Sequence, residues 1–129
     1  MSEENAIPTD AELRTIPDGE VLHVLPGGLM IVRRKKHEYT PKLADLAQDE
    51  LANWSNKRNG SKFNSEWSLA AYVRWVVAQL EILGWNENTA AGDHTVEVGR
   101  FVGWSSGIMT TRVRIEISSR CIHAYPVLE

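Results

Sequence analysis

The sequence predicts an α+β fold: a four-stranded antiparallel sheet made of two hairpins, with two central helices packed on one face and a short N-terminal helix. Three observations support this prediction. Two pairs of apolar, β-branched segments are each joined by a glycine-containing turn, as in β-hairpins. Two longer segments between these pairs repeat apolar residues at the helical period. Because the helices fall between the two hairpins, we expect them to cover a single face of one sheet.

Length and composition predict an ordinary globular protein. The chain has 129 residues, of which 43% are hydrophobic and 24% charged, so we expect a single domain over 9–129 after a flexible tail over 1–8. Its one cysteine excludes an intramolecular disulfide and a zinc site of four thiolates. The N-terminus is polar and acidic, and no apolar stretch reaches the ~20 residues that span a bilayer. We therefore expect a cytoplasmic protein that does not enter a membrane.

The first third of the chain predicts a capped helix followed by a hairpin. Thr9 and Glu12 form a capping box, in which each side chain satisfies a backbone N–H of the first helical turn. Strands are predicted over 20–25 and 29–36. The proline and two glycines at 26–28 supply the turn between them.

The first central helix is predicted over 41–58. Thr40 is a favourable N-cap residue, Pro41 suits the first helical position, and Gly60 ends the segment. The apolar stripe of this helix consists of Leu43, Leu46, Ala47, Leu51 and Trp54.

The second central helix is predicted over 66–84, capped by Asn64 or Ser65 and ended by Gly84. At ~100° per residue its apolar side chains fall on two separate faces. The broader, aliphatic face consists of Tyr72, Leu83, Val76, Leu69, Leu80, Val73 and Val77. The narrower Trp/Ala face consists of Trp67, Ala71, Trp75, Ala78, Ile82 and Trp85. We expect the aliphatic face to lie on the sheet.

The Trp/Ala face has two interpretations. In the first, the helix over 41–58 covers this face inside one monomer. In the second, part of the face lies in an interface with another protein or a second copy of the chain, because large aromatic residues are enriched in interfaces and most homo-oligomers use one self-complementary patch. The candidate interface residues are Trp67, Trp75, Ile82 and Trp85.

Strands over 94–104 and 108–125 are predicted to form the second hairpin. The last of them alternates clearly, with Val113, Ile115 and Ile117 directed to one face. We expect these three residues to face the core.

Ser119, Cys121 and His123 extend that face if the last strand is unbroken. A Cys–His catalytic pair is unfavourable, because residues two apart on a strand are ~6.6 Å apart, so we expect a buried cysteine and a hydrogen-bonded histidine. A metal site that uses Cys121 and His123 is also unfavourable, because no recognisable ligand pair such as CxxC or HExxH is present. Its other candidate ligands are His94, Asp93 and His23. No catalytic residue, metal ligand or cofactor is therefore predicted.

Basic residues concentrate in two short segments of a chain whose net charge is −3. They could together follow a phosphate backbone; alternatively, they are a solvated strand end and a solvated loop, whose charges discourage edge pairing between sheets. No helix-turn-helix, RNP or P-loop pattern accompanies them. The clustered residues are Arg33, Arg34, Lys35, Lys36, Lys57, Arg58 and Lys62.

The leading hypothesis is a small, non-enzymatic protein that acts by contact with another macromolecule, as a regulator, inhibitor or assembly factor, and that forms a homo-oligomer. Nucleic-acid binding through the basic clusters at 33–37 and 57–62 is the first alternative. A small enzyme or ligand-binding protein with a site near His94, Cys121 and His123 is the second. No motif in the sequence is specific to a known family.

Overall fold

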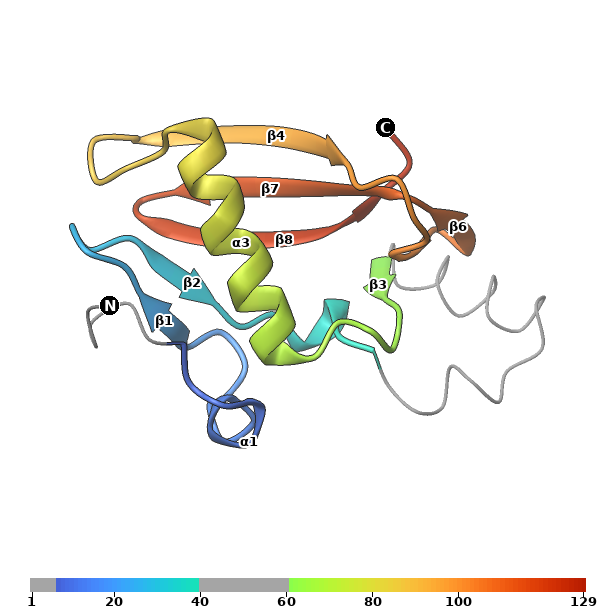
Figure 1. Cartoon of the computed structure of the whole chain (residues 1–129), viewed down its shortest axis with the longest axis horizontal. Helices are drawn as coiled ribbons and strands as arrows, with labels where there is room; N and C mark the ends of the chain where they lie inside the picture. Colours follow the sequence, from blue (N-terminus) through green and yellow to red (C-terminus); the bar gives the residue numbers. More distant parts are fainter. Residues whose placement is uncertain (1–6, 40–60) are drawn as a thin grey trace. The chain divides into compact units, whose positions relative to one another are not determined.

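The computed structural model describes residues 7–39 and 61–129 (Figure 1). These residues form an α+β structure with a five-stranded sheet, of strand order β1-β2-β8-β7-β4, and a three-stranded sheet, of strand order β3-β5-β6. The elements are α1 (Asp10–Leu13), β1 (Val21–Val24), β2 (Met30–Val32), the 3₁₀ helix η2 (Lys35–His37), β3 (Ser61–Phe63), α3 (Leu69–Leu83), β4 (Ala91–Glu97), β5 (Gly103–Ser105), β6 (Ile108–Thr110), β7 (Arg112–Ser118) and β8 (Cys121–Val127).

The chain divides into two compact units. The described residues of unit 1 are 7–34, 68–94 and 115–124, and those of unit 2 are 35–39, 61–67, 95–114 and 125–129. Unit 1 holds α1, β1, β2 and α3; unit 2 holds η2, β3, β5 and β6; the strands β4, β7 and β8 contribute residues to both. The single domain over 9–129 stays a prediction, and most of the expected tail lies outside the described residues.

The predicted capping box begins α1. The hydroxyl of Thr9 accepts a hydrogen bond from the backbone N–H of Glu12, whose carboxylate accepts one from the N–H of Thr9. Asp10 extends this capping to a second helix, since its Oδ1 accepts from the N–H groups of Leu69 (2.8 Å) and Ala70 (3.4 Å). The first turn of α1 therefore satisfies the orphan donors at the start of α3 as well as its own.

The long helix α3 begins at Leu69, later than the predicted Glu66, and ends at Gly84 as predicted. Ser68 is the N-cap, and its hydroxyl accepts from the N–H of Ala71 at 3.1 Å. Asn64, one of the two expected caps, instead donates from its amide to the carbonyl of Phe101. Gly84 adopts a φ of +70°, the left-handed conformation that ends many helices.

Within unit 1, α3 lies across one face of the larger sheet (Figure 1). The helix is anchored by the hydroxyl of Tyr72, which accepts from the backbone N–H of Ala124 on β8 at 2.8 Å. The buried side chains of α3 are Leu69, Ala70, Tyr72, Val73, Val76 and Leu80. All but Ala70 belong to the predicted aliphatic face. The other predicted helix, over 41–58, lies outside the described residues.

The larger sheet is mixed, so the predicted four-stranded antiparallel sheet is wrong in detail. β1 and β2 pair antiparallel, as predicted, but β2 also pairs parallel with β8 through Met30 and Cys121. β2 ends at Val32, before the predicted limit of 36. Arg33 follows; its side chain is buried, and its guanidinium donates to the carbonyls of Arg14 and Ile16.

The predicted strand over 108–125 is three strands, β6, β7 and β8. Ser119 and Arg120 have φ values of +51° and +67° and form the two-residue turn between β7 and β8. The turn changes which residues face the core. The buried residues are Val113, Ile115 and Ile117 on β7, as predicted, and Ile122, Ala124 and Pro126 on β8. Cys121 and His123 therefore lie on the opposite face, and their predicted place in the core is wrong.

Unit 2 contains a strand that the sequence did not predict, β3, whose three residues are all buried. The carbonyl of Ser61 accepts a hydrogen bond from Nδ1 of His37 at 2.9 Å, so Nδ1 carries the proton. The His37 ring stacks on Tyr125, with ring centroids 4.9 Å apart. The ammonium of Lys62 donates to the carbonyl of Glu38 at 3.2 Å. These polar contacts allow a strand of serine and lysine to be buried.

Candidate functional site

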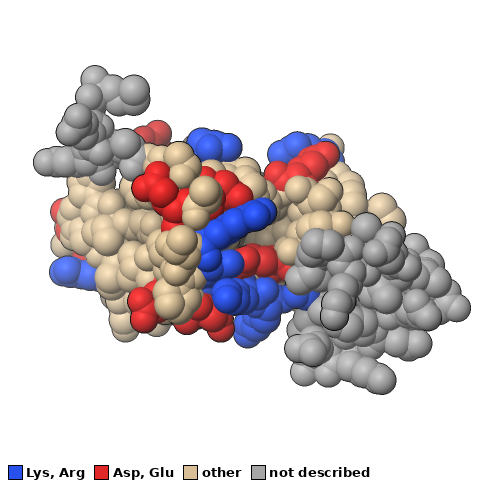
Figure 2. Space-filling model, turned by 90° about the horizontal axis from the view of Figure 1, so that it is seen from below, with Lys and Arg blue, Asp and Glu red and all other residues tan. Residues whose placement is uncertain are grey.

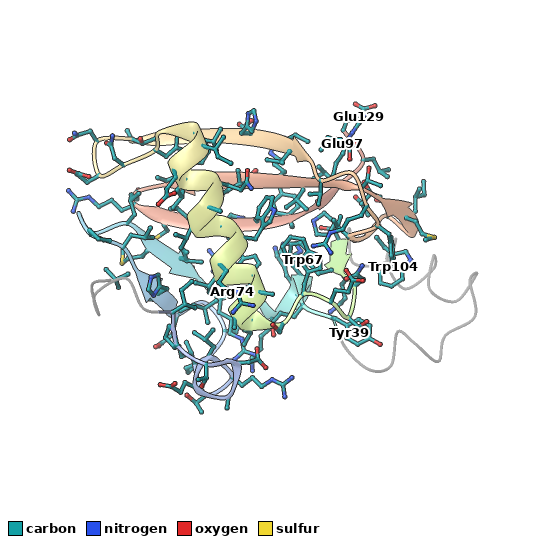
Figure 3. The ribbon with its side chains drawn as sticks, viewed as in Figure 1. Tyr39, Trp67, Arg74, Glu97, Trp104 and Glu129 are labelled. Atoms are coloured by element: carbon teal, nitrogen blue, oxygen red, sulfur yellow. The ribbon has the colours of Figure 1, made fainter. Side chains whose placement is uncertain are left out.

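The four predicted interface residues fall in two units, Trp67 in unit 2 and the other three in unit 1. Trp67 precedes α3 and is buried in unit 2, where its ring stacks on Phe63 with centroids 4.4 Å apart (Figure 3). Trp75 is half-buried on α3, and Ile82 is 76% exposed. Trp85 follows the C-cap of α3 and is half-buried in unit 1. Arg74, which borders the Trp/Ala face, is exposed on the outer side of the helix (Figure 3).

A groove of about 340 Å³ lies in unit 1, between the C-terminal half of α3 and the β1–β2 hairpin. We call it the α3–hairpin groove. Its apolar lining consists of Leu25, Pro26, Leu29, Val77, Leu80 and Trp85. Its polar lining consists of His23, Glu81, Asn86 and Glu87. Its size and mostly apolar lining are typical of a binding pocket.

Glycines at two chain reversals shape this groove. After Gly84 the chain turns back, and the N–H of Trp85 donates to the carbonyl of Leu80 at 3.1 Å. Gly27, at a φ of +91°, allows the carboxylate of Glu87 to approach the hairpin turn, since a Cβ at Gly27 would lie 2.6 Å from Oε2 of Glu87. A larger residue at Gly27 would displace the carboxylate of Glu87, whereas at Gly84 it would meet no other atom within 4 Å and would be strained only by the positive φ.

The charges that line the groove are acidic. Glu81 and Glu87 supply two carboxylates, and no Lys or Arg is among the described residues that line it. Burial lowers the pKa of His23, because the charged imidazolium loses hydration there. The groove therefore combines an apolar lining with two acidic side chains and a histidine whose neutral form is favoured.

Exposed apolar side chains adjoin the groove in the chain. Val24, the last residue of β1, lies in the chain between the lining residues His23 and Leu25 and is 54% exposed. Ile82 follows Glu81 on α3 and is the most exposed large apolar residue among those described. Isolated exposed apolar residues are common on protein surfaces, so these two do not define the groove.

A second groove, of about 520 Å³, lies on the face of unit 1 that carries Cys121 and His123. Nε2 of His123 lies 3.4 Å from the carboxylate of Glu116 on the neighbouring strand. Asp93 and Arg34 also line this groove, whereas His94, expected there from the sequence, does not. No cluster of three or more metal-ligating side chains occurs in the part of the chain that the structure describes.

Among the described residues, the predicted basic clusters are only partly exposed. Arg33 and Lys62 are buried, and both donate to backbone carbonyls. Lys57 and Arg58 lie outside the described residues. Lys35 and Lys36 are exposed. On the face drawn in Figure 2, basic side chains lie beside acidic ones among the described residues, an arrangement that weakens the case for a phosphate-binding surface.

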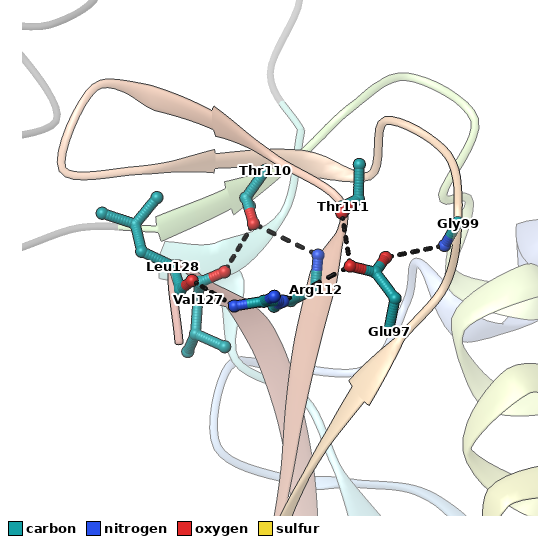
Figure 4. Close-up of polar contacts among 7 residues, drawn as sticks. All are labelled: Glu97, Gly99, Thr110, Thr111, Arg112, Val127 and Leu128. Carbon is teal, nitrogen blue, oxygen red and sulfur yellow. Dashed lines mark hydrogen bonds and ion pairs between the residues drawn. The ribbon is translucent and has the colours of Figure 1, made fainter.

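A polar network in unit 2 joins the strands β4, β7 and β8 near their ends (Figure 4). Glu97 accepts from the hydroxyl of Thr111 (3.0 Å), the N–H of Gly99 (2.9 Å) and Nε of Arg112 (3.3 Å). Thr110 donates to the carbonyl of Val127. Hydrogen bonds from Thr111 and Gly99, and the charge of Arg112, lower the pKa of Glu97.

Comparisons of this chain with protein-family models, with curated proteins and with solved structures found no match. Among residues 7–39 and 61–129, no helix has both the length and the apolar character that a membrane crossing requires. The geometry of the chain itself therefore carries the functional argument.

The sequence predicted the hairpin turn and the helix end that form the α3–hairpin groove, but it did not predict that they lie close together. The glycine turn at 26–28 and the helix stop at Gly84 are both visible as local patterns. Their proximity depends on the position of α3 across the sheet, which a local pattern does not specify. Glu81 and Glu87 were consequently not among the predicted site residues.

Proposed function

We propose that this protein acts without catalysis by binding another polypeptide through the α3–hairpin groove. The bound segment places an apolar side chain in the groove and carries Lys or Arg beside it. One observation supports this proposal above the others: the groove combines an apolar lining with two carboxylates, and no Lys or Arg is among the described residues that line it.

The apolar lining supplies most of the proposed affinity. Full burial of one leucine-sized or phenylalanine-sized side chain contributes about 1.5–3 kcal/mol. The carboxylates of Glu81 and Glu87 contribute less, about 0–1 kcal/mol for each exposed ion pair. Their main effect is on selectivity and on the association rate, because they attract basic segments and repel acidic ones.

The same charges disfavour a second copy of this chain as the occupant. In a two-fold symmetric contact the same patch lies on both sides. Two copies meeting at this groove would bring Glu81 and Glu87 close to their own counterparts, and such like-charge contacts oppose association. A different polypeptide of opposite charge is the better fit.

Selection of random displayed peptides on the full-length protein tests this proposal. We expect enriched peptides to share an apolar residue flanked by Lys or Arg. Enrichment of peptides with acidic flanks, or of none, would contradict the proposal.

A charge reversal gives the matched comparison. The variant Glu81→Lys/Glu87→Lys should bind the enriched peptides about tenfold more weakly, as expected from the loss of two exposed ion pairs. The control variant Glu66→Lys/Glu129→Lys makes the same charge change at two exposed residues of unit 2 and should bind like the unmodified protein. If the double variant bound the peptides as tightly as the unmodified protein, Glu81 and Glu87 would not be part of the binding site.

A further inference from the structure

The strand β6 presents an exposed apolar edge in unit 2. It is an end strand of the three-stranded sheet, where it pairs with β5. Ile108 is 57% exposed and Met109 56% exposed, although both lie in a strand. Leu128, 39% exposed, lines a groove of about 300 Å³ together with Met109 and Phe101. The same groove is lined by Glu97 and Arg112, which form an ion pair of opposite charges at 3.3 Å. This surface, which we call the β6 edge, belongs to a different unit from the α3–hairpin groove.

The β6 edge lacks the usual protection of an end strand. Proteins guard such strands with charged side chains, often lysine, or with proline, because an open strand edge pairs readily with another strand. The residues over 101–111 contain no Asp, Glu, Lys, Arg or Pro. A contact between two copies at this segment therefore brings no like charges together, in contrast to the acidic groove of unit 1.

The hairpin register identifies the backbone groups at this edge. β5 and β6 are joined by Ser106 and Gly107, and Ser105 pairs with Ile108 while Gly103 pairs with Thr110. The carbonyl of Thr110 accepts from the N–H of Val102 at 3.0 Å. In an antiparallel pair, alternate residues direct both backbone groups to the partner strand. The backbone N–H and C=O groups of Ile108 and Thr110 thus point toward β5, and those of Met109 point away from it.

From this arrangement we infer that the protein self-associates through the β6 edge. Two copies pair their β6 strands antiparallel about a two-fold axis, and the N–H and C=O of Met109 exchange hydrogen bonds with those of the partner's Met109. Ile108 and Met109 of each copy then become covered. The pairing is isologous, so it closes at a dimer. Because each copy contributes a short strand, the contact is small and the dissociation constant is on the order of 100 µM.

Analytical ultracentrifugation of the full chain over a range of concentrations tests the association. We expect the weight-average mass to rise from monomer toward dimer. The variant Met109→Lys should remain monomeric, because two lysines would meet at the two-fold axis. The control variant Ala11→Lys places the same charge on an exposed residue of α1, in unit 1, and should associate like the unmodified protein.

Amide hydrogen exchange distinguishes pairing of the β6 strands from non-specific association. In the unmodified protein, exchange at the Met109 amide should slow as concentration rises, while exchange at the Trp104 amide, on β5, should not change. This measurement needs no variant, so it holds even if Met109→Lys alters the hairpin. A monomer at all concentrations, or a dimer with unchanged exchange at Met109, would overturn the inference.

Discussion

The α3–hairpin groove of unit 1 and the β6 edge of unit 2 are both exposed and apolar, but they differ in charge. The groove carries two carboxylates, whereas the hairpin that contains β6 carries no ionised side chain. They also differ in shape, since one is a hollow between a helix and a turn and the other is an open strand edge. Charge therefore decides the expected partner: a basic segment of another polypeptide at the groove and a second copy at the edge.

The largest expected effect is a difference in unfolding free energy between two glycine-to-alanine variants, one in each unit. In Gly103→Ala, the new Cβ would collide with the carbonyl oxygen of Lys62 on β3, so we expect unfolding free energy to fall by about 3 kcal/mol. Gly84→Ala meets nothing within 4 Å and should cost about 1 kcal/mol, the strain of alanine at a φ of +70°. Urea unfolding of both variants measures the difference.

Glycine variants should also divide the two proposed binding activities. Gly103→Ala distorts β5 and should abolish self-association while leaving peptide binding intact. Gly27→Ala, whose Cβ would lie 2.6 Å from Oε2 of Glu87, displaces that carboxylate and should weaken peptide binding alone. If either variant impaired both activities equally, the two surfaces would not be independent.

A smaller effect on stability is expected at a two-residue turn. Unit 2 has one such turn, between β5 and β6, and unit 1 has another, between β7 and β8. The turn between β5 and β6 has glycine at its second position, with Gly107 at a φ of +77°, whereas the β7–β8 turn has Arg120 at +67°. Replacing Arg120 by glycine relieves the strain of a side chain in the left-handed region, so we expect stabilisation by about 0.5–1 kcal/mol. Thermal unfolding measures it. The control Arg120→Ala removes the side chain without relieving φ and should not stabilise.

The smallest expected effect is a pH dependence at Glu97 in unit 2. Its pKa is lower in the folded chain than in the unfolded one, chiefly because of the hydrogen bond from Thr111. The resulting stability is present above the unfolded pKa, about 4.3, and is lost as pH falls through the folded value. Compared with Glu97→Gln, the unmodified protein should lose more stability on acidification from pH 5 to pH 3. Parallel melting curves at every pH would contradict this.

Local patterns in the sequence predicted much of unit 1. The Thr9–Glu12 capping box, the hairpin of β1 and β2, the aliphatic face of α3 and its end at Gly84 are confirmed. Each depends on residues close together in the chain, where periodicity and turn chemistry decide the conformation. The α+β class follows from these elements in order.

The errors arose where long-range contacts override local patterns. Nothing near Ser119 and Arg120 favours positive φ, so the sequence predicted a continuous strand and placed Cys121 and His123 on the wrong face. The strand β3 contains Ser61 and Lys62, which are buried only because His37 and Glu38 supply distant polar partners. The sequence predicted Arg33 as an exposed basic residue. In the structure its guanidinium is buried because it donates to the carbonyls of Arg14 and Ile16, just after α1.

The parallel pairing of β2 with β8 has a consequence for how the chain folds. Met30 and Ile31 pair with Cys121 and Ile122, which lie near the opposite end of the sequence. Closing so long a loop costs chain entropy before any contact repays it, so we expect the sheet to be completed late and slowly. Until then, one edge of the early β1–β2 hairpin stays open. During synthesis that edge is where a nascent chain would be most exposed to wrong pairing.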